Sequence, residues 1–309
     1  MTASPVGVIG LGIMGSAMSA NLVKAGFEVI GYDTVAARQT TLSRSGGRPA
    51  RSAMDVGKRA PIVITSLPSS DALAAVSAQL ARSGRRGQIV VETSTLPLDV
   101  KETARKLLAP RGITLLDCPL SGTGAQARTR DLVVFASGDA GAYRKCVPVF
   151  EGMARKHFLV GAFGDGSKMK FIANLLVAIH NVAAAEAMVL GMKAGLDPAQ
   201  VLAVVTSGAG TSRMLEVRGP MMVKGDYSEA TMKVEVWQKD MRIIGEYARS
   251  IDCPTPLFLA SAPFYTAAMA MGRGSEDTGA VCAVLEEMAR VRRRRARRSL
   301  PRRTHMDSA

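Results

Sequence analysis

Short apolar runs rich in β-branched residues alternate with helical segments through the first half of the chain. Strands are predicted at residues 6–9, 28–32, 61–65, 88–92 and 113–116, and helices at 13–25, 35–44, 71–81 and 98–108. Strands separated by helices of about ten residues are typical of βαβ units, which build a parallel sheet. Further strands at 131–136 and 157–160 could extend it. The pattern predicts an α/β domain with a doubly wound parallel sheet over residues 1–163.

The pattern changes after Gly166, beyond which the chain offers no strong strand. A helix is predicted from Ser167 to Ala194; at about 1.5 Å per residue it would be roughly 40 Å long and could join two domains. The other predicted helices cover residues 198–206, 213–224, 232–251, 256–271 and 277–296. We therefore expect an all-helical domain over residues 164–289, joined to the α/β domain by the long helix.

Neither a membrane span nor a leader peptide is predicted. The longest apolar stretch, Phe171–Met192, contains Asn174, Asn181 and Glu186, which suit a buried helix better than a lipid-exposed one. No basic segment precedes the first strand. The four cysteines are widely spaced, which argues against a disulfide framework or a zinc site. A reducing compartment, by default the cytoplasm, is the expected location.

The net charge of +14 is concentrated at the C-terminus. Nine arginines and one acid, Asp307, lie in residues 290–309, so the rest of the chain carries only +6. An arginine-rich segment could contact nucleic acid or another acidic surface. No aromatic residue is interleaved with these arginines. We therefore favour a disordered, solvated tail over residues 290–309, and we do not expect nucleic acid as a partner.

A glycine-rich motif, Gly10-Leu11-Gly12-Ile13-Met14-Gly15, lies between the first predicted strand and the first predicted helix. G-x-G-x-x-G in this context indicates a dinucleotide-binding domain of the Rossmann type. The first glycine permits a tight turn, the second lets a pyrophosphate approach the backbone, and the third allows the helix to pack closely on the strand. The helix N-terminus offers N–H groups to the phosphates. A glycine-rich turn without a ligand is the alternative.

Asp33 follows the second predicted strand, eighteen residues after Gly15. A carboxylate at this place can accept a hydrogen bond from the adenosine ribose 2′-hydroxyl and would repel a 2′-phosphate, so NAD is favoured over NADP. Arg38 lies nearby and could weaken this preference. Alternatively, Asp33 only caps the helix that follows.

Two loops follow later strands of the predicted sheet, Ser66-Leu67-Pro68 and Ser94-Thr95-Leu96-Pro97. Loops at the carboxyl ends of parallel strands line the ligand crevice of such domains. Leu67, Pro68 and Thr95 are therefore candidates for contact with the ribose and nicotinamide of the cofactor. Taken alone, either loop could equally be an ordinary turn from a strand into a helix.

Four motifs together resemble those of the β-hydroxyacid dehydrogenases, the 3-hydroxyisobutyrate dehydrogenase family. They occur in family order, span residues 6 to about 289, and correspond to the family's nucleotide signature, its D-A-P-V-S-G-G substrate motif, its glycine-rich K-x-x-x-N catalytic motif and its K-D-L element. In this chain they are Gly10–Gly15 with Asn21-Leu22, Asp117-Cys118-Pro119-Leu120-Ser121-Gly122, Gly164–Lys170 with Asn174, and Lys239-Asp240-Met241.

The resemblance implies roles for residues far apart in the chain. Lys170 would be the catalytic residue, and Asn174 would orient the substrate or the lysine. Thr95 and Lys239 would lie near the nicotinamide. The site would lie between the domains, and the helical domains would pair into a dimer or tetramer.

The resemblance also implies a pocket for the substrate carboxylate, at Ser121 and Gly122. The chain departs from the family here, because Thr123 replaces the second glycine of S-G-G, and again at Ala173, where the family often has asparagine. Both differences concern which acid is bound, and Thr123 would shape the pocket. The segment from Thr206 to Arg218 resembles the threonate dehydrogenase branch more than the 3-hydroxyisobutyrate branch.

The chemistry of Lys170 supports its assignment independently. Oxidising an alcohol requires a base that removes the hydroxyl proton while hydride leaves the same carbon. A free lysine is too basic, with a pKa of about 10.4, but a helix N-terminus and burial both lower the pKa of an ammonium group. Asn174 lies one helical turn on, on the same face, which selects Lys170 over Lys168. Lys170 could otherwise be a solvated surface lysine.

The leading hypothesis is a dehydrogenase that transfers hydride between NAD, with NADP as the alternative, and a small 3-hydroxy acid of the 3-hydroxyisobutyrate, threonate or glycerate class. One alternative is a non-catalytic NAD-binding module that contacts nucleic acid, as in a branch of the family. Another is an imine reductase, although those enzymes usually lack lysine at the catalytic position. Retention of Lys170 favours the dehydrogenase. No metal site is expected.

Overall fold

The computed structural model describes residues 4–83, 85–291 and 293. Strands and helices alternate up to residue 159, as the sequence pattern predicts. The strands are β1 (Val6–Ile9), β2 (Val29–Tyr32), β3 (Arg48–Pro49), β4 (Ile62–Thr65), β5 (Ile89–Glu92), β6 (Thr114–Asp117), β7 (Leu120–Ser121), β8 (Val133–Ala136) and β9 (Lys156–Leu159). The helices of this part are α1 (Ile13–Lys24), α2 (Ala36–Arg44), α3 (Ala53–Arg59), α4 (Ser70–Ser83), α5 (Leu98–Leu108), α6 (Gly124–Arg128) and α7 (Ala140–Met153), with a 3-10 turn, η1, at Ala109–Arg111.

Six strands form a parallel sheet in the order β3-β2-β1-β4-β5-β6. This is the doubly wound order of a Rossmann domain, in which the order of the strands reverses between β1 and β4. The carboxyl ends of these two central strands therefore border a crevice. The glycine motif lies directly after β1, so the predicted fold class is confirmed and the motif lies where such domains bind their ligands.

Helices cover both faces of this sheet. One hydrophobic core contains side chains of β1, α1, α6 and α7, including Met18, Leu22 and Phe150. A second core, on the other face, gathers side chains of α3, α4 and α5, including Val56 and Leu80. Because both faces are covered, the central strands are apolar on both sides, which explains their continuous β-branched runs.

The later strands do not simply extend the parallel sheet. Strands β7, β8 and β9 form a separate three-stranded sheet, in which β7 and β8 are antiparallel and β8 and β9 are parallel. An isolated bridge between Asp117 and Ser137 links it to the end of β6. The short elements β3, α3, β7 and α6 and the longer helix α7 lie in segments for which the sequence pattern predicted no element.

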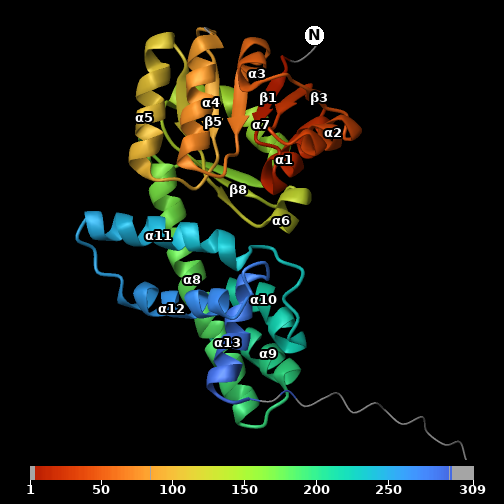
Figure 1. Cartoon of the computed structure of the whole chain (residues 1–309), viewed down its shortest axis with the longest axis vertical. Helices are drawn as coiled ribbons and strands as arrows, with labels where there is room; N and C mark the ends of the chain where they lie inside the picture. Colours follow the sequence, from red (N-terminus) through yellow and green to blue (C-terminus); the bar gives the residue numbers. More distant parts are fainter. Residues whose placement is uncertain (1–3, 84, 292, 294–309) are drawn as a thin grey trace, which may run out of the picture.

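Helix α8 (Asp165–Lys193) leaves the α/β domain and runs through the helical domain, as Figure 1 shows. The remaining helices are α9 (Pro198–Thr206), α10 (Arg213–Lys224), α11 (Val234–Ser250), α12 (Pro256–Ala270) and α13 (Val281–Met288), with a 3-10 turn, η2, at Thr278–Ala280. All of them pack around α8 in a core that includes Phe171, Met188 and Trp237. The predicted long connecting helix and the helical domain are thus confirmed.

The last predicted helix, 277–296, is wrong at both ends. Asp277 is the N-cap of η2, and α13 ends at Met288. Arg290 adopts a positive φ of 50°, which is incompatible with a continuing right-handed helix. Most of the predicted tail, including residues 294–309, lies outside the described residues.

Helix α8 is also the one helix among the described residues that is long and apolar enough to cross a membrane by length and composition alone. Several of its polar side chains, Ser167, Lys170, Asn174 and Asn181, are buried in the protein. Asn181, for example, is fully buried and donates to the carbonyl of Thr278 at 2.8 Å. The core helix of a protein domain passes the same test of length and composition.

Candidate active site

The glycine motif forms the loop between β1 and α1, and its first and third glycines are required by close packing. Gly10 has a φ of 90°, and a Cβ added there would lie 2.1 Å from the carbonyl oxygen of Ser66. A Cβ added at Gly15 would lie 1.8 Å from the carbonyl oxygen of Gly10. Larger residues at either position would force the loop away from β4.

Gly12 differs, because a Cβ added there would meet no atom within 4 Å. The protein itself therefore does not require glycine at this position, whereas a ligand that approaches the backbone would. Gly12 is the N-cap of α1 and provides no side-chain cap, and the neighbouring Ile13 is 66% exposed. The first N–H groups of α1 thus face an open surface, which fits the pyrophosphate of a dinucleotide.

Asp33 holds the glycine loop in place. Its Oδ2 accepts a hydrogen bond from the N–H of Leu11 at 2.7 Å, and its Oδ1 accepts one from the N–H of Val35 at 2.8 Å. Val35 is the N-cap of α2, so Asp33 stabilises both the loop and the next helix. The half-exposed Arg38 pairs with the same carboxylate at 3.2 Å. A carboxylate has about four acceptor sites, so a ribose hydroxyl could still bind beside these partners.

The loops after β4 and β5 are tied to each other and to the helical domain. The N–H of Leu67 donates to Ser94 Oγ at 2.8 Å, next to the exposed Pro68. The carbonyl of Thr95 accepts a hydrogen bond from Lys239 Nζ on α11 at 2.9 Å. Two residues that the family resemblance assigns to the nicotinamide region are thus in contact, although they are far apart in the sequence.

The proposed carboxylate motif lies beside the glycine loop. Ser121 ends β7, Gly122 has a φ of 133°, and Thr123 is the N-cap of α6. Thr123 forms a capping box with Gln126, accepting its backbone N–H and donating its own backbone N–H to Gln126 Oε1. A Cβ added at Gly124 would touch Ile13 at 2.4 Å, which shows how closely α6 approaches the nucleotide loop.

Lys170 lies in the second turn of α8 and is only 8% exposed. Burial lowers the pKa of its ammonium group below the ordinary value for lysine, the charge of Asp240 raises it, and the charge of Lys239 lowers it. The net shift is downward, as the sequence analysis expected from burial. The adjacent Lys168 is exposed and pairs with Asp165 on the surface.

Asn174 connects the lysine helix to α11. It is 3% exposed, and its Nδ2 donates to Asp240 Oδ2 at 3.0 Å. The other carboxylate oxygen of Asp240 lies 3.6 Å from Lys239 Nζ. Burial raises the pKa of Asp240, while Lys239, Lys170 and Asn174 counteract this effect. Lys239, Asn174 and Asp240 therefore form a polar cluster between two helices, which adjoins the loop that contains Thr95 and whose charges act on Lys170.

Asp240 is a functional candidate that the sequence analysis quoted without giving it a role. Its signal is its place on α11, where the other buried residues, among them Trp237, Met241 and Ile244, are all apolar. An acid in that apolar stripe is costly unless it has partners. The pattern of α11 alone could therefore have singled it out.

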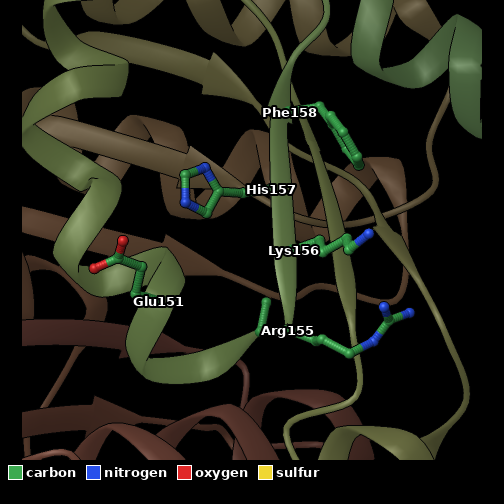
Figure 2. Close-up of a pocket in the computed structure, with 6 residues that line it drawn as sticks. Glu151, Arg155, Lys156, His157 and Phe158 are labelled. Carbon is green, nitrogen blue, oxygen red and sulfur yellow. The ribbon is translucent and has the colours of Figure 1, made fainter.

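The surface also has a hollow that none of these residues lines. Figure 2 shows it beside β9, where about 350 Å³ is lined by Glu151, Ala154, Arg155, Lys156, His157 and Phe158. None of the predicted site residues belongs to it. Within the described part of the chain, no group of three or more His, Cys, Asp or Glu side chains could hold a metal ion.

Family profiles match both domains. Residues 5–161 match the NAD binding domain of 6-phosphogluconate dehydrogenase, and residues 164–285 match the NAD-binding family of NADP-dependent 3-hydroxyisobutyrate dehydrogenase. The L-threonate dehydrogenase of Cupriavidus necator is 35% identical over 280 residues, which cover 89% of this chain and 94% of that protein. The 2-(hydroxymethyl)glutarate dehydrogenase of Eubacterium barkeri is 29% identical, covering 93% of this chain and 96% of that protein.

Solved structures give the same result. The 3-hydroxyisobutyrate dehydrogenase of Salmonella typhimurium superposes with a TM-score of 0.82 at 29% identity, covering 90% of this chain and 99% of that one. The Mycobacterium tuberculosis 3-hydroxyisobutyrate dehydrogenase with L-serine gives a TM-score of 0.83 at 28% identity, covering 91% and 99%. The chain therefore belongs to the β-hydroxyacid dehydrogenase family and is an NAD(P)-dependent hydroxyacid dehydrogenase.

Proposed function

We propose that this enzyme oxidises a small 3-hydroxy acid reversibly, with Lys170 as the general base and with NAD as the preferred coenzyme. The observation that carries this proposal is a buried amine whose pKa is lowered by burial. The charge of this amine interacts with Asp240 and Lys239, which belong to a polar cluster that links α8 and α11 to the loop after β5. A lysine in bulk water would be protonated at neutral pH and could not serve as a base.

The proton and the hydride of the substrate would go to different acceptors. In the oxidation, Lys170 Nζ takes the hydroxyl proton, and the electrons of the O–H bond form the new C=O bond. A dinucleotide held by the glycine loop would supply the acceptor for the hydride that leaves the carbinol carbon. In the reduction, the protonated lysine returns the proton to the carbonyl oxygen. A neutral amine is therefore needed for oxidation and an ammonium for reduction.

Asn174 and Asp240 would influence the orientation and the pKa of Lys170 and would take no direct part in hydride transfer. The hydrogen bond between them fixes one face of α8 against α11, and Asn174 is one turn from Lys170. The negative charge of Asp240 keeps the pKa of Lys170 from falling further. We infer that the amide orients the substrate or the amine and that the carboxylate tunes the basicity of the amine.

Ser121 and Gly122 would bind the substrate carboxylate through the hydroxyl and the backbone beside the glycine loop. Thr123 would contribute to the pocket without binding the carboxylate through its hydroxyl, because that hydroxyl already forms hydrogen bonds with Gln126 of α6. Thr123 would then fix the shape of this loop and the size of the pocket. Leu67, Pro68, Thr95 and Lys239 would line the nicotinamide side.

For the substrate we favour a threonate-like acid, because several of the similar proteins are L-threonate dehydrogenases. For the coenzyme we favour NAD, since the buried Asp33 carboxylate would repel a 2′-phosphate. The neighbouring Arg38 reduces this repulsion. NADP would then be accepted with lower affinity.

We also propose a homodimer or homotetramer assembled through the helical domain, which we take as residues 164–289, after an NAD-binding domain of residues 1–163. Several large apolar side chains of α8 are exposed in the single chain, namely Ile172, Leu176 and Leu190 at 57%, 46% and 72%. An apolar face of this kind is typical of a surface that another subunit covers. A cytoplasmic location is part of the same proposal.

The test is a substrate panel followed by absorbance at 340 nm. The purified protein is incubated with NAD or NADP and with L-threonate, 3-hydroxyisobutyrate, glycerate or 2-(hydroxymethyl)glutarate. We expect turnover with at least one acid and a higher kcat/KM with NAD. Absence of turnover with every acid and both coenzymes would contradict the proposed substrate class.

The role of Lys170 is tested by Lys170→Ala, with Lys168→Ala as the matched control on the exposed side of the same helix. We expect the first variant to lose about 1000-fold or more in kcat while it binds NADH almost normally. The control should retain full activity. Undiminished turnover by Lys170→Ala would refute the assignment.

A further inference from the structure

A second buried lysine lies beneath the active-site loops, on the α/β side of the molecule. Lys101 on α5 is fully buried, and its Nζ lies 2.7 Å from Glu92 Oε2 and 2.7 Å from Asp117 Oδ1. It also donates a hydrogen bond to the carbonyl of Ser94 at 2.7 Å. Both carboxylates are fully buried as well. One amine thus binds the end of β5, the turn that follows it and the end of β6.

Lys101 stays charged. Burial by itself lowers the pKa of this amine, but the charges and hydrogen bonds of Asp117 and Glu92 outweigh burial and raise the pKa above its ordinary value. The group is therefore a permanent cross-link and not an acid or base in the reaction. Buried ion clusters contribute little to stability, because desolvation offsets the Coulombic gain. A fixed geometry is the benefit that such a cluster can provide.

Asp117 extends the link to the helix that contains Lys170. Its Oδ1 also accepts a hydrogen bond from Ser167 Oγ at 2.8 Å, and its Oδ2 accepts one from the backbone N–H of Ser167 at 2.7 Å. Ser167 lies in the first turn of α8, three residues before Lys170. The position of the catalytic helix therefore depends on a carboxylate that Lys101 holds.

Ser94 extends the link in the other direction, toward the coenzyme. Its Oγ accepts the N–H of Leu67, and the next residue, Thr95, accepts the hydrogen bond from Lys239. The turn held by Lys101 through the Ser94 carbonyl is thus the turn expected beside the nicotinamide. Two segments that must keep a fixed distance during hydride transfer are thus linked to Lys101 Nζ, the turn directly and the first turn of α8 through Asp117.

We propose that Lys101 is a positioning residue for hydride transfer, which holds the turn at residues 93–95 and the first turn of α8 in a fixed relative arrangement. This inference rests on the function proposed above. An error of about 1 Å in such an arrangement can cost about 100-fold in rate, while the binding of coenzyme and acid, which uses other contacts, would change little.

Two variants test the proposal. Lys101→Met alone would leave two buried carboxylates without a cation, so the double variant Lys101→Met/Glu92→Gln removes one charge of each sign and keeps the net charge of the cluster. Ser167→Ala loosens the same link from the other end by removing one hydrogen bond to Asp117. Lys106→Met, at an exposed lysine of the same helix, is the matched control.

The first measurement is amide hydrogen exchange in the free protein, which needs neither substrate nor coenzyme. In the double variant we expect faster exchange both at residues 93–95 and at the first turn of α8. Ser167→Ala should show the increase at α8 alone, and the control should match the original protein. Unchanged exchange at the two segments in the double variant would overturn the proposal, and it would do so even if L-threonate is not a substrate.

The second measurement is the primary isotope effect with L-threonate deuterated at its carbon-bound positions. We expect kcat of the double variant to fall about 10- to 100-fold, KM to change less than about threefold, and the isotope effect on kcat to rise because hydride transfer becomes slower. A lower melting temperature with an unchanged isotope effect and kcat would show a purely structural lysine and overturn the proposal. No turnover by the original protein would count against the proposed substrate class only.

Discussion

Helices α1 and α8 start in the same way and serve different purposes. Each has a glycine as its N-cap, Gly12 or Gly164, and neither glycine provides a side-chain cap. At α8 the first N–H groups form hydrogen bonds with residues far away in the sequence, since Gly166 donates to Ser137 Oγ and Ser167 donates to Asp117. At α1 the first N–H groups face open space beside Gly12. A glycine before a helix therefore indicates a ligand site only where no other part of the protein fills it.

The comparison also bears on how the fold would position the coenzyme and the proposed catalytic lysine. The open start of α1 can bind phosphate by its N–H groups and its dipole. The filled start of α8 cannot bind an anion, but it is held rigidly against the end of β6, and Lys170 lies one turn further on. In the proposed function, the start of α1 would bind the coenzyme and the start of α8 would align the lysine.

The largest expected effect comes from Asp117→Asn, which tests whether the start of α8 depends on a charged cap. One oxygen of Asp117 accepts from Lys101 Nζ and the other from the N–H of Ser167. Neither group can act as an acceptor, so the amide nitrogen of asparagine would face a donor in either orientation. We expect a loss of about 3 kcal/mol in the free energy of unfolding, measured by denaturant titration. A loss below about 1 kcal/mol would show that α8 does not need this carboxylate.

The next effect contrasts the two helix starts directly. In Gly12→Val the new side chain points into open space, so the fold should be unaffected, whereas the approach of a pyrophosphate is blocked. We expect NADH affinity to fall about 100-fold, or about 2.7 kcal/mol, with an unchanged melting temperature. Fluorescence titration and calorimetry measure the two quantities.

Gly166→Ala is the matched change at α8. Its Cβ would lie 2.3 Å from the carbonyl oxygen of Phe135 and 2.7 Å from that of Asp117. The expected result is the opposite one, a lower melting temperature from overpacking. If Gly12→Val destabilised the protein as much as Gly166→Ala does, the distinction between an open and a filled helix start would be wrong.

A smaller effect is expected at the amine that α8 positions. The charge of Asp240 raises the pKa of Lys170, so Asp240→Asn should lower that pKa. Oxidation requires the neutral amine, and its rate rises as the pH increases through this pKa. The rising limb of kcat/KM for oxidation should therefore move to lower pH, and the falling limb for reduction should move with it. If the pH profile of kcat/KM does not move, Asp240 does not influence the group whose titration limits the rate.

The smallest effect concerns the C-terminal end of α10, which is capped by a side chain from a later part of the chain. Arg293 donates to the carbonyls of Met222 and Val223 in the last turn of α10 and also pairs with Glu286. Arg293→Gln should lower the free energy of unfolding by about 1 kcal/mol, measured by denaturant titration. Arg290→Gln, at an exposed neighbour, is the control and should change little. Equal values for both variants would exclude a capping role.

Much of the candidate site could be proposed from the sequence because its residues occur in short motifs with local causes. The loop Gly10–Gly15 needs its glycines for contacts within a few residues or with the next strand, and the spacing of Lys170 and Asn174 follows from one helical turn. Asp240 and Lys101 were harder to predict. Their partners lie 66 residues away at Asn174 and 16 residues away at Asp117, so no local spacing reveals the pairing.

The sequence by itself determined the order of strands and helices, the nucleotide loop and the lysine helix, because periodicity and glycine placement act over one turn or one strand. Only the tertiary structure decided which helix start is open and which is filled, that Thr123 caps α6, and that a lysine on α5 is completely buried. Those outcomes depend on which surfaces meet after folding. Desolvation, which gives a buried charge its partners and shifts its pKa, arises only at that stage.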